Sequence, residues 1–488
     1  MIDETKVCDH RKGCDGKHTR LPFLFGEGFS RRQFFRIAGS ALTGYYFTRV
    51  TRSIDVLAQS KVQTIGSAKN VVFIFLDGAP SHVDTFDFKQ TDSTPADFAP
   101  ETYNGVTLSR RLFPVLSDQL DRIAIARSVL ARAAVHQLAR TWSQIGRNPT
   151  GPLGNISPHI GAVVALELDS KRRPSDVLPG FVALNTGQIP GAGYLPTRYS
   201  PFSVGANQNG VGALIHPDGA TRFTDRYKLL QEIDSPLRLE SPIGKAAEDM
   251  DDFTQSAITL MSNAQVGDAF RFTAAERTAW APPNGLNGFG DACLVTSKLL
   301  KVNRGTRFIT ISFGGWDMHN NIYAQTGIYQ AANRLDAGLG QLIKELRNTA
   351  SPETPGKTLL DETLIVMQGE FGRTIGRVTN NGGRDHYLRQ FVVFAGANVR
   401  PYGIVGQTDA MGSQNKPVDY GWKANRDIRA EDVFATVYST LGIDWTTVRY
   451  DDPIKRGFEY VPSAKDGYYE PVNELFLTTD PGRSRRII

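Results

Sequence analysis

Cysteine is scarce in this chain. Three cysteines occur among 488 residues, and two of them, Cys8 and Cys14, lie close to the N-terminus. Cys293 is then the only thiol left after residue 58, so an intrachain disulfide is excluded there. The spacing of Cys8, His10, Cys14 and His18 is irregular and does not indicate a zinc site. The fold must therefore depend on an apolar core.

A long apolar run and a strong charge of one sign are also missing. The stretch 37–47 is apolar but shorter than the roughly 20 residues that span a bilayer. The formal net charge is +5, and residues 1–58 contain ten Lys/Arg against six Asp/Glu, so the remainder carries +1. Nucleic acid is not indicated as a partner. With 40% hydrophobic and 22% charged residues, the composition is that of a folded globular protein.

The N-terminus has the features of a targeting signal. Ser30-Arg31-Arg32-Gln33-Phe34-Phe35-Arg36 precedes the short apolar stretch and resembles a bacterial twin-arginine export signal. We therefore expect residues 1–58 to be a leader read by the twin-arginine translocase, with the protein delivered to the periplasm or secreted. An uncleaved leader would tether the protein to the membrane. The alternative is an amphipathic surface helix that happens to contain an Arg-Arg pair.

After the leader, strand-like and helix-like segments alternate. Val71–Leu76 has the six consecutive apolar residues of a buried parallel strand, and further strands are predicted at 122–129, 307–313, 363–368 and 391–395. Helices are predicted at 112–120, 133–145, 325–347 and 431–441. This alternation predicts one α/β domain over 59–488, with a mostly parallel central sheet covered by helices on both faces. The Gly/Pro/Asn-rich range 183–300 is expected to be a loop-rich insertion on the substrate side.

Polar side chains gather where these strands end. Asp77 ends the first strand, Asp317 and His319 follow the strand at 307–313, Glu370 follows 363–368, and His386 follows a double glycine. Ligands of open α/β sheets bind at the carboxyl ends of the strands. Carboxylates and imidazoles without thiolates predict a divalent metal, with zinc, manganese, magnesium and calcium as candidates.

Two further groups of residues near these strand ends could contact a ligand. Arg373 and Arg384 stand beside glycines and could contact an anion such as a phosphate or sulfate ester. Ser81, His82 and Asp84 could form a hydrolytic triad, but such close spacing is more typical of turn chemistry.

Four ordered motifs carry a family resemblance. They are Leu76–Asp87, Phe313–His319, Gly369–Thr374 and Gly382–His386, and the C-terminal segment 432–443 also matches. On these motifs the chain resembles the bacterial domain of unknown function 1501 family, which looks like a member of the alkaline phosphatase–sulfatase superfamily. The resemblance implies a three-layer alkaline-phosphatase-like α/β fold. It also implies that Asp77, Asp317, His319, Glu370 and His386 are metal ligands.

The nucleophile departs from the superfamily pattern. No Cys/Ser-x-Pro-x-Arg motif is present, and counting back from Gly146 puts His136 at the nucleophile position and Arg140 at the arginine position. His136 could coordinate metal, act as nucleophile, or act as general base toward metal-activated water. It could also be only a packing or capping residue of the helix at 133–145.

These observations predict an exported metal-dependent hydrolase acting on phosphate or sulfate esters, with His136, Arg140 and Arg373 as catalytic residues. Two alternatives stay open. One is a catalytically silent relative that binds anionic glycans at the envelope, and the other is a metal-dependent phosphotransferase or mutase. The substrate in each case is a small-molecule or glycan anionic ester.

Overall fold

The computed structural model describes residues 62–211, 219–239, 258, 264–282 and 287–477. The expected leader, residues 1–58, lies outside the described residues. Among the described helices, none is long and apolar enough to cross a membrane.

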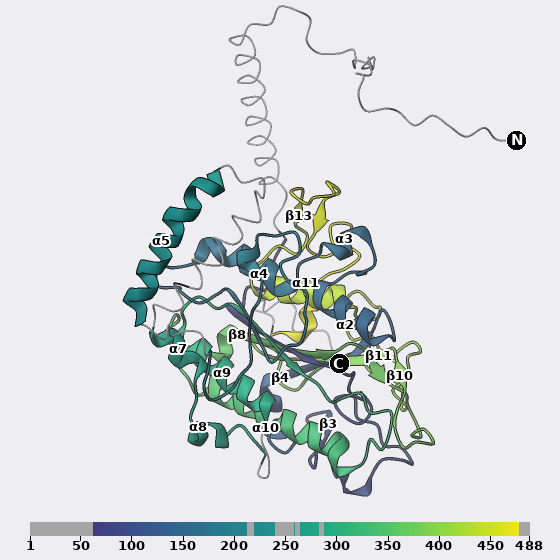
Figure 1. Cartoon of the computed structure of the whole chain (residues 1–488). Helices are drawn as coiled ribbons and strands as arrows, with labels where there is room; N and C mark the ends of the chain where they lie inside the picture. The colour runs from purple at the N-terminus through teal and green to yellow at the C-terminus, as the bar shows by residue number, and fades with distance from the viewer. Residues whose placement is uncertain (1–61, 212–218, 240–257, 259–263, 283–286, 478–488) are drawn as a thin grey trace, which may run out of the picture. The chain divides into compact units, whose positions relative to one another are not determined.

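One eight-stranded sheet forms the centre of the fold (Figure 1). Seven of its strands run in one direction, and β11 alone is antiparallel to its neighbours β4 and β8. The predicted mostly parallel sheet is therefore confirmed. In spatial order the strands are β12 (Gly403–Val405), β4 (Ile123–Leu130), β11 (Arg389–Gly396), β8 (Thr363–Gly369), β1 (Asn70–Leu76), β7 (Phe308–Phe313), β5 (Phe181–Leu184) and β6 (Phe202–Val204).

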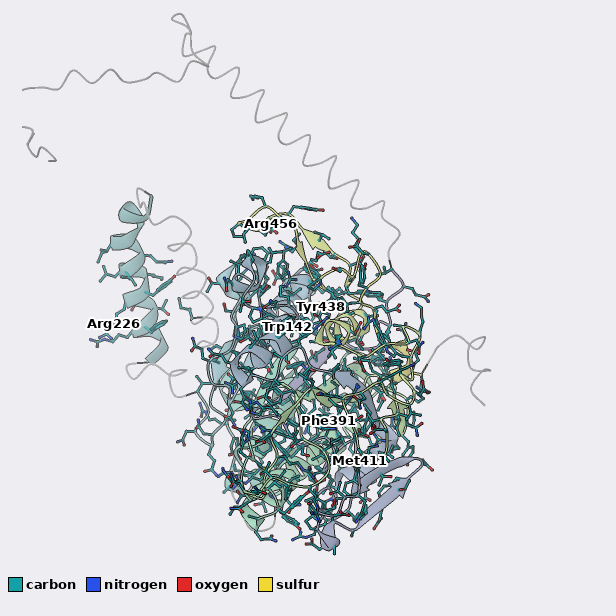
Figure 2. All side chains as sticks on the ribbon, turned by 90° about the vertical axis from the view of Figure 1, so that its right-hand side faces the viewer. Trp142, Arg226, Phe391, Met411, Tyr438 and Arg456 are labelled. Atoms are coloured by element: carbon teal, nitrogen blue, oxygen red, sulfur yellow. The ribbon has the colours of Figure 1, made fainter. Side chains whose placement is uncertain are left out.

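Helices cover both faces of the sheet because β1 is apolar on both faces. Successive side chains of a strand point to opposite faces. From Val72 to Leu76 the even-numbered residues of β1 enter the core shared with α9 (Gly288–Val302) and α10 (Gln330–Arg347). The odd-numbered residues enter the core shared with α4 (Ile160–Leu168) and α11 (Ala430–Thr440). Figure 1 shows these two helix pairs on opposite sides of the sheet, and Figure 2 shows side chains filling the layers between them.

Shorter elements decorate this three-layer core. The helices are α2 (His136–Ile145), α3 (Pro152–Asn155), α5 (Gly219–Leu239), α7 (Ala264–Phe270) and α8 (Ala274–Thr278). Three small two-stranded sheets pair β2 (Pro100–Tyr103) with β3 (Val106–Ser109), β9 (Gly372–Arg373) with β10 (His386–Tyr387), and β13 (Val448–Arg449) with β14 (Phe458–Glu459). Tight helical turns occur at Ala96–Phe98, Leu116–Arg122, Asp169–Lys171, Thr197–Tyr199, Leu360–Glu362 and Asn473–Leu475, and a π-helical turn at Gln325–Tyr329 precedes α10.

Some boundaries differ from those expected. The helix predicted at 112–120 is a 3₁₀ turn that begins at Leu116, and α2 begins at His136 rather than at residue 133. Within the range 183–300, β6 pairs with β5 in the central sheet, and α9 is buried in the main core. These two elements belong to the α/β core because their apolar residues face it. The substrate-side role of the remaining described loops stays a prediction.

Candidate metal centre

The polar groups gather at the carboxyl edge of the sheet. The parallel strands β1, β7 and β8 end side by side, so Asp77, the loop after Phe313 and Glu370 are brought to one edge. The N-terminus of α2 brings His136 to the same edge, and the β9–β10 hairpin brings Arg373 and His386. A parallel sheet collects groups from distant parts of the sequence in this way.

Four side chains form the cluster at this edge: His136, Asp317, His319 and His386. One ligand atom from each lies within 4.8 Å of every other. Asp317 Oδ1 is 3.1 Å from His319 Nε2 and 3.4 Å from His136 Nε2, and His319 Nε2 is 3.1 Å from His386 Nε2. Donors around a tetrahedral ion with bonds of about 2.0–2.1 Å are about 3.3 Å apart. The cluster therefore has the size of a single cation site.

The other ring nitrogen of each histidine has an acceptor as partner. His136 Nδ1 lies 2.7 Å from Glu370 Oε1, His319 Nδ1 lies 2.9 Å from Asp385 Oδ1, and His386 Nδ1 lies 2.7 Å from the carbonyl of Ala134. Carbonyl and carboxylate oxygens accept, so the network assigns the proton of each neutral ring to Nδ1. Each Nε2 then directs a lone pair into the cluster, as the partners of metal-binding histidines usually arrange.

The donor set fits a divalent ion. Among the described residues, His136 Nε2 is a buried nitrogen with no hydrogen-bond partner. His319 Nε2 lies 3.1 Å from His386 Nε2, and Arg373 Nη1 donates to it at 3.1 Å, so positive charge is already drawn to this nitrogen. Three imidazoles and one carboxylate suit zinc or manganese better than calcium or magnesium, which prefer all-oxygen ligands.

The pKa shifts of Asp317 and His386 favour their metal-binding forms, whereas that of His136 does not. The hydrogen bond to Glu370 raises the pKa of His136 and so favours its protonated ring when no metal is bound. Burial lowers the pKa of His386 and favours the neutral ring. Burial alone would raise the pKa of Asp317, but the hydrogen bond and charge of Arg373 outweigh it and lower that pKa. Asp317 is thus held ionised and His386 neutral, the forms in which these groups bind metal.

The sequence predicts Glu370 as a metal ligand, but in this structure its carboxylate is hydrogen-bonded to protein groups. Its side chain is buried, and its two oxygens accept from the backbone N–H groups of Gly78, at 3.0 Å, and Ala79, at 3.1 Å. Oε1 also bonds His136. These bonds occupy the carboxylate, which lies outside the four-residue cluster. Glu370 therefore positions His136 in this structure.

Asp77 also points elsewhere. Its Oδ1 lies 2.5 Å from Arg140 Nη2, and Asp77 is not part of the four-residue cluster. The ion pair forms because Arg140, one helical turn after His136 in α2, reaches over the end of β1. The two catalytic candidates of α2 are thus divided, with His136 in the cluster and Arg140 paired to Asp77.

Arg373 is a structural cation rather than a free anion-binding group. Its side chain is 1% exposed, and all five N–H groups donate within the protein. The acceptors are the carbonyls of Ala79, Gly78 and Arg384, with Asp317 Oδ1 at 2.5 Å and His319 Nε2 at 3.1 Å. The guanidinium therefore fastens the turn after β1 to the loop after β7, and the substrate contact expected from the sequence is not available to it.

The candidate triad does not assemble. Ser81 Oγ donates directly to Asp84 Oδ2 at 2.6 Å, and the Nε2 atom of His82 pairs with the carbonyl of Gly412 at 2.8 Å. Asp84 is instead the partner of the buried Arg384, whose Nε donates to it at 2.7 Å, and of Tyr323. Arg384, expected as an anion contact, is thus a buried structural residue.

Residues that pack behind the cluster had no clear sequence signal. Phe371 lies 4.8 Å from the ring of His136 and 4.6 Å from that of His386, measured between centroids. Asp385 belongs to the Gly382–His386 motif, but its role as partner of His319 depends on a contact between residues 66 positions apart. Position after a strand identifies polar candidates and does not reveal which of them touch.

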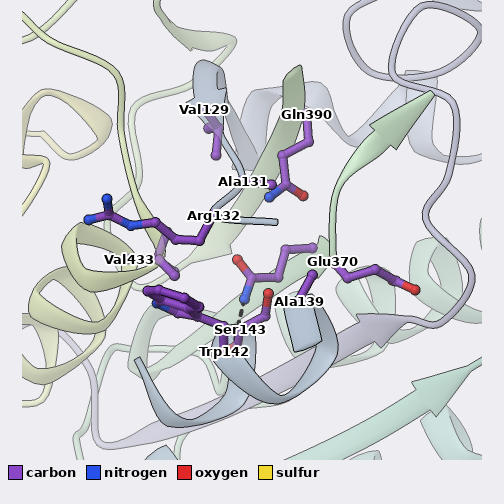
Figure 3. A pocket seen from close by; sticks show the side chains of 11 residues that line it. Val129, Ala131, Arg132, Ala139, Trp142, Ser143, Glu370, Gln390 and Val433 are labelled. Carbon is purple, nitrogen blue, oxygen red and sulfur yellow. Dashed lines mark hydrogen bonds between the residues drawn. The ribbon is translucent and has the colours of Figure 1, made fainter. Parts of the chain in front are cut away.

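A small cavity of about 10 Å³ lies behind α2 (Figure 3). Ala139, Trp142 and Ser143 line it from α2, and Glu370 and Gln390 line it from the sheet side. Gln390 Oε1 has no hydrogen-bond partner among the described residues, and the volume is about that needed by one water. The cavity is too small for a substrate.

A family comparison agrees with the motifs. The model of the family described as protein of unknown function DUF1501 matches residues 68–457, and the chain belongs to this family. No curated protein matches the chain.

Several solved structures are similar in outline. The chain is 9% identical to a protein in the alkaline phosphatase superfamily from Vibrio parahaemolyticus, covering 79% of this chain and 69% of that one with a TM-score of 0.36. It is 11% identical to the lipoteichoic acid synthase LtaP from Listeria monocytogenes, covering 83% and 80%, TM-score 0.36. It is also 11% identical to the phosphonate monoester hydrolase SpPMH from Silicibacter pomeroyi, covering 84% and 78%, TM-score 0.36. We draw nothing about the reaction from scores this low.

Proposed function

We propose that the chain is a metal-dependent hydrolase of phosphate or sulfate esters, with one divalent ion held by His136, Asp317, His319 and His386. The observation that carries the proposal is the convergence of three Nε2 lone pairs and one carboxylate oxygen within 4.8 Å, each imidazole being held by its Nδ1 atom. Zinc and manganese are the favoured ions.

The charge balance supports a single ion. Four carboxylates lie in or beside the cluster, those of Asp77, Asp317, Glu370 and Asp385. Arg140 and Arg373 are paired with two of them. With neutral imidazoles the group carries two excess negative charges, and one divalent ion balances them.

The chain's own residues supply the remaining functions. A divalent ion at this place would act as a Lewis acid on an ester oxygen. Glu370 keeps the proton of His136 on Nδ1 and so keeps Nε2 available. Arg140, whose side chain is 39% exposed, is the guanidinium beside the cluster that can meet an anionic oxygen of the substrate.

A second candidate has its own supporting observation. Arg373 already donates to Asp317 Oδ1 and His319 Nε2, so a buried guanidinium provides positive charge where the ion would bind. A catalytically silent protein would then need no metal, and it would contact an anionic glycan through the partly exposed Arg140.

Metal analysis combined with an ester panel separates the two candidates. We would measure metal content of the full chain by mass spectrometry and assay phosphate and sulfate monoesters and diesters with zinc, manganese, magnesium or calcium. One equivalent of metal, and turnover that Asp317→Ala and His136→Ala both abolish, is the expected result. Asp92→Ala, at an exposed carboxylate, is the control and should keep both. A folded protein without metal and without turnover would favour the silent binding protein.

We also propose export by the twin-arginine route. The support is the Ser-Arg-Arg-x-Phe-Phe segment and the apolar run behind it. Arg31→Lys and Arg32→Lys together should keep the protein in the cytoplasm, because a lysine lacks the guanidinium fork. Cell fractionation measures this, and normal periplasmic delivery of the double variant would contradict the route.

A further inference from the structure

A second cavity, here called the Arg140 pocket, adjoins the cluster. Its volume is about 40 Å³. It lies over the ends of β1, β7 and β5, which are neighbours in the sheet, and is covered by α2. The residues that line it are Phe75, Asp77, Arg140, Gln144, Thr186, Gly187, Gln188, Ile189, Thr310 and Ser312.

Two polar atoms of this pocket have no hydrogen-bond partner among the described residues. They are Arg140 Nε and Thr186 Oγ1, and both are buried. A buried donor or acceptor left unpaired costs about 1–3 kcal/mol. The cavity is larger than the roughly 10–15 Å³ that a water needs, so a substrate substituent of a few atoms can enter and satisfy both. The two atoms thus mark a place for an oxygen-bearing group.

The pocket and the cluster are neighbours along α2, although they share no lining residue. His136 and Arg140 are four residues apart in α2 and therefore lie on the same helix face, about 6 Å apart along the axis. Since three bonds of an extended chain span about 3.8 Å, a substrate covers that distance with about five bonds. An ester bound at the cluster would therefore have part of its alcohol within reach of the Arg140 pocket.

The charges of the pocket favour a neutral group. Arg140 is balanced by Asp77, whose Oδ1 lies 2.5 Å from Nη2. A second anion on the substrate would be repelled by the Asp77 carboxylate. A hydroxyl can accept from Arg140 Nε and donate to Thr186 Oγ1 or Asp77, which a simple alkyl group cannot do.

We propose that the Arg140 pocket binds hydroxyl groups on the alcohol part of the ester, so that the substrates are esters of sugars or polyols. This inference rests on the proposed ester hydrolysis and names its substrate class. Thr186, in the loop after β5, is the residue that discriminates such alcohols from plain alkyl alcohols.

The test compares glycerol 1-phosphate with propyl phosphate, which differs by lacking the two hydroxyls. The full chain should prefer glycerol 1-phosphate by about tenfold or more, the effect of one buried hydrogen bond. Thr186→Val should reduce this preference by about tenfold with propyl phosphate little changed, and Thr186→Ser should restore it. Thr141→Val is the control, because that hydroxyl bonds the carbonyl of Gln137 and does not line the pocket.

Turnover is assayed and binding is measured by titration calorimetry. Together they distinguish failure of the pocket inference from failure of the proposed hydrolysis. Equal turnover and equal affinity of the unmodified protein for the two esters would overturn the inference. A Thr186→Val effect of equal size on both esters would overturn it as well. A preference seen in binding without any turnover would support the pocket and contradict the hydrolysis. Metal content is checked for every variant, and Thr186→Val should leave it unchanged.

Discussion

Glu370 Oε1 and His136 Nδ1 are hydrogen-bonded at 2.7 Å, although 234 positions separate the two residues. The same carboxylate accepts from the N–H groups of Gly78 and Ala79. One buried side chain therefore fixes the imidazole of α2 relative to the turn that follows β1. The orientation of His136 in the cluster therefore depends on Glu370.

We expect Glu370→Gln to weaken metal binding by about 10–100-fold, the usual effect of losing a partner of a metal-binding histidine. The amide can donate to His136 Nδ1, which moves the ring proton to Nε2 and removes the lone pair from the cluster. Competition with a chelator of known affinity measures the change. An affinity equal to that of the unmodified protein would contradict the positioning role.

Asp77→Asn is the matched comparison. Asp77 pairs with Arg140 and lies outside the cluster, so this variant should keep one equivalent of metal. His319→Ala, which removes a cluster member, should lose it. Loss of metal from Asp77→Asn as complete as from His319→Ala would return Asp77 to the ligand set that the sequence predicts.

Arg373→Lys should destabilise the fold by about 1–3 kcal/mol, the cost of leaving buried acceptors such as the carbonyls of Gly78 and Ala79 unpaired. Lysine has three donors on a flexible stem and cannot replace five N–H groups in a planar fork. The control is Arg377→Lys, four residues on, whose side chain is 83% exposed and should change stability by less than about 0.5 kcal/mol. Urea unfolding measures both, and similar midpoints would show that the buried network adds little.

Gly383→Ala should displace His319 and reduce metal binding. A Cβ at residue 383 would lie 2.0 Å from the carbonyl carbon of His319, closer than atoms can approach, so one of the two segments must move. Overpacking of this kind costs about 1–3 kcal/mol. Gly205→Ala is the control, since a Cβ there would meet nothing within 4 Å among the described residues. Metal content and thermal unfolding of the two variants should differ, and equal values would contradict the close approach.

His159 should make stability fall as pH decreases. Burial among aromatic rings lowers the pKa of His159 to about 3, from 6.5. Below pH 6.5 the unfolded chain binds a proton at this residue that the folded protein does not, so stability is lost as pH falls from 6.5 toward 3. The loss is about 1.4 kcal/mol per pH unit for this group.

His159→Asn should reduce the slope of the unfolding free energy against pH by the amount due to one proton. Asparagine can still cap α4, as His159 Nδ1 does by accepting from Gly161. His82, another buried histidine with a lowered pKa, is present in both proteins, so the difference in slope isolates residue 159. Urea unfolding at several pH values measures the slopes, and parallel curves would contradict the prediction.

The sequence predicts the sheet better than it predicts the site. The apolar runs of β1 and β8 can only be buried strands, and their ends bring Asp77 and Glu370 to one edge. What a strand end does not determine is the direction of the side chain that follows it. Asp77 turns toward Arg140 and Glu370 toward the backbone of the neighbouring turn, and both choices depend on partners at least 63 positions away.

The sequence also predicts both histidines from their positions. His319 follows the strand at 307–313, and His386 follows a double glycine. Their Nδ1 partners, Asp385 and the carbonyl of Ala134, become visible only in three dimensions.

The loop after β5 offers a route to new selectivity. Thr186, Gly187 and Gln188 line the Arg140 pocket, whereas the cluster comes from α2, the loop after β7 and β10. If the proposals hold, this loop contributes to substrate recognition without supplying any residue of the cluster, while α2 contributes to both. A library randomised at residues 186–188 should therefore change the proposed specificity while leaving the four cluster residues intact, and most of its members should bind metal as the unmodified protein does.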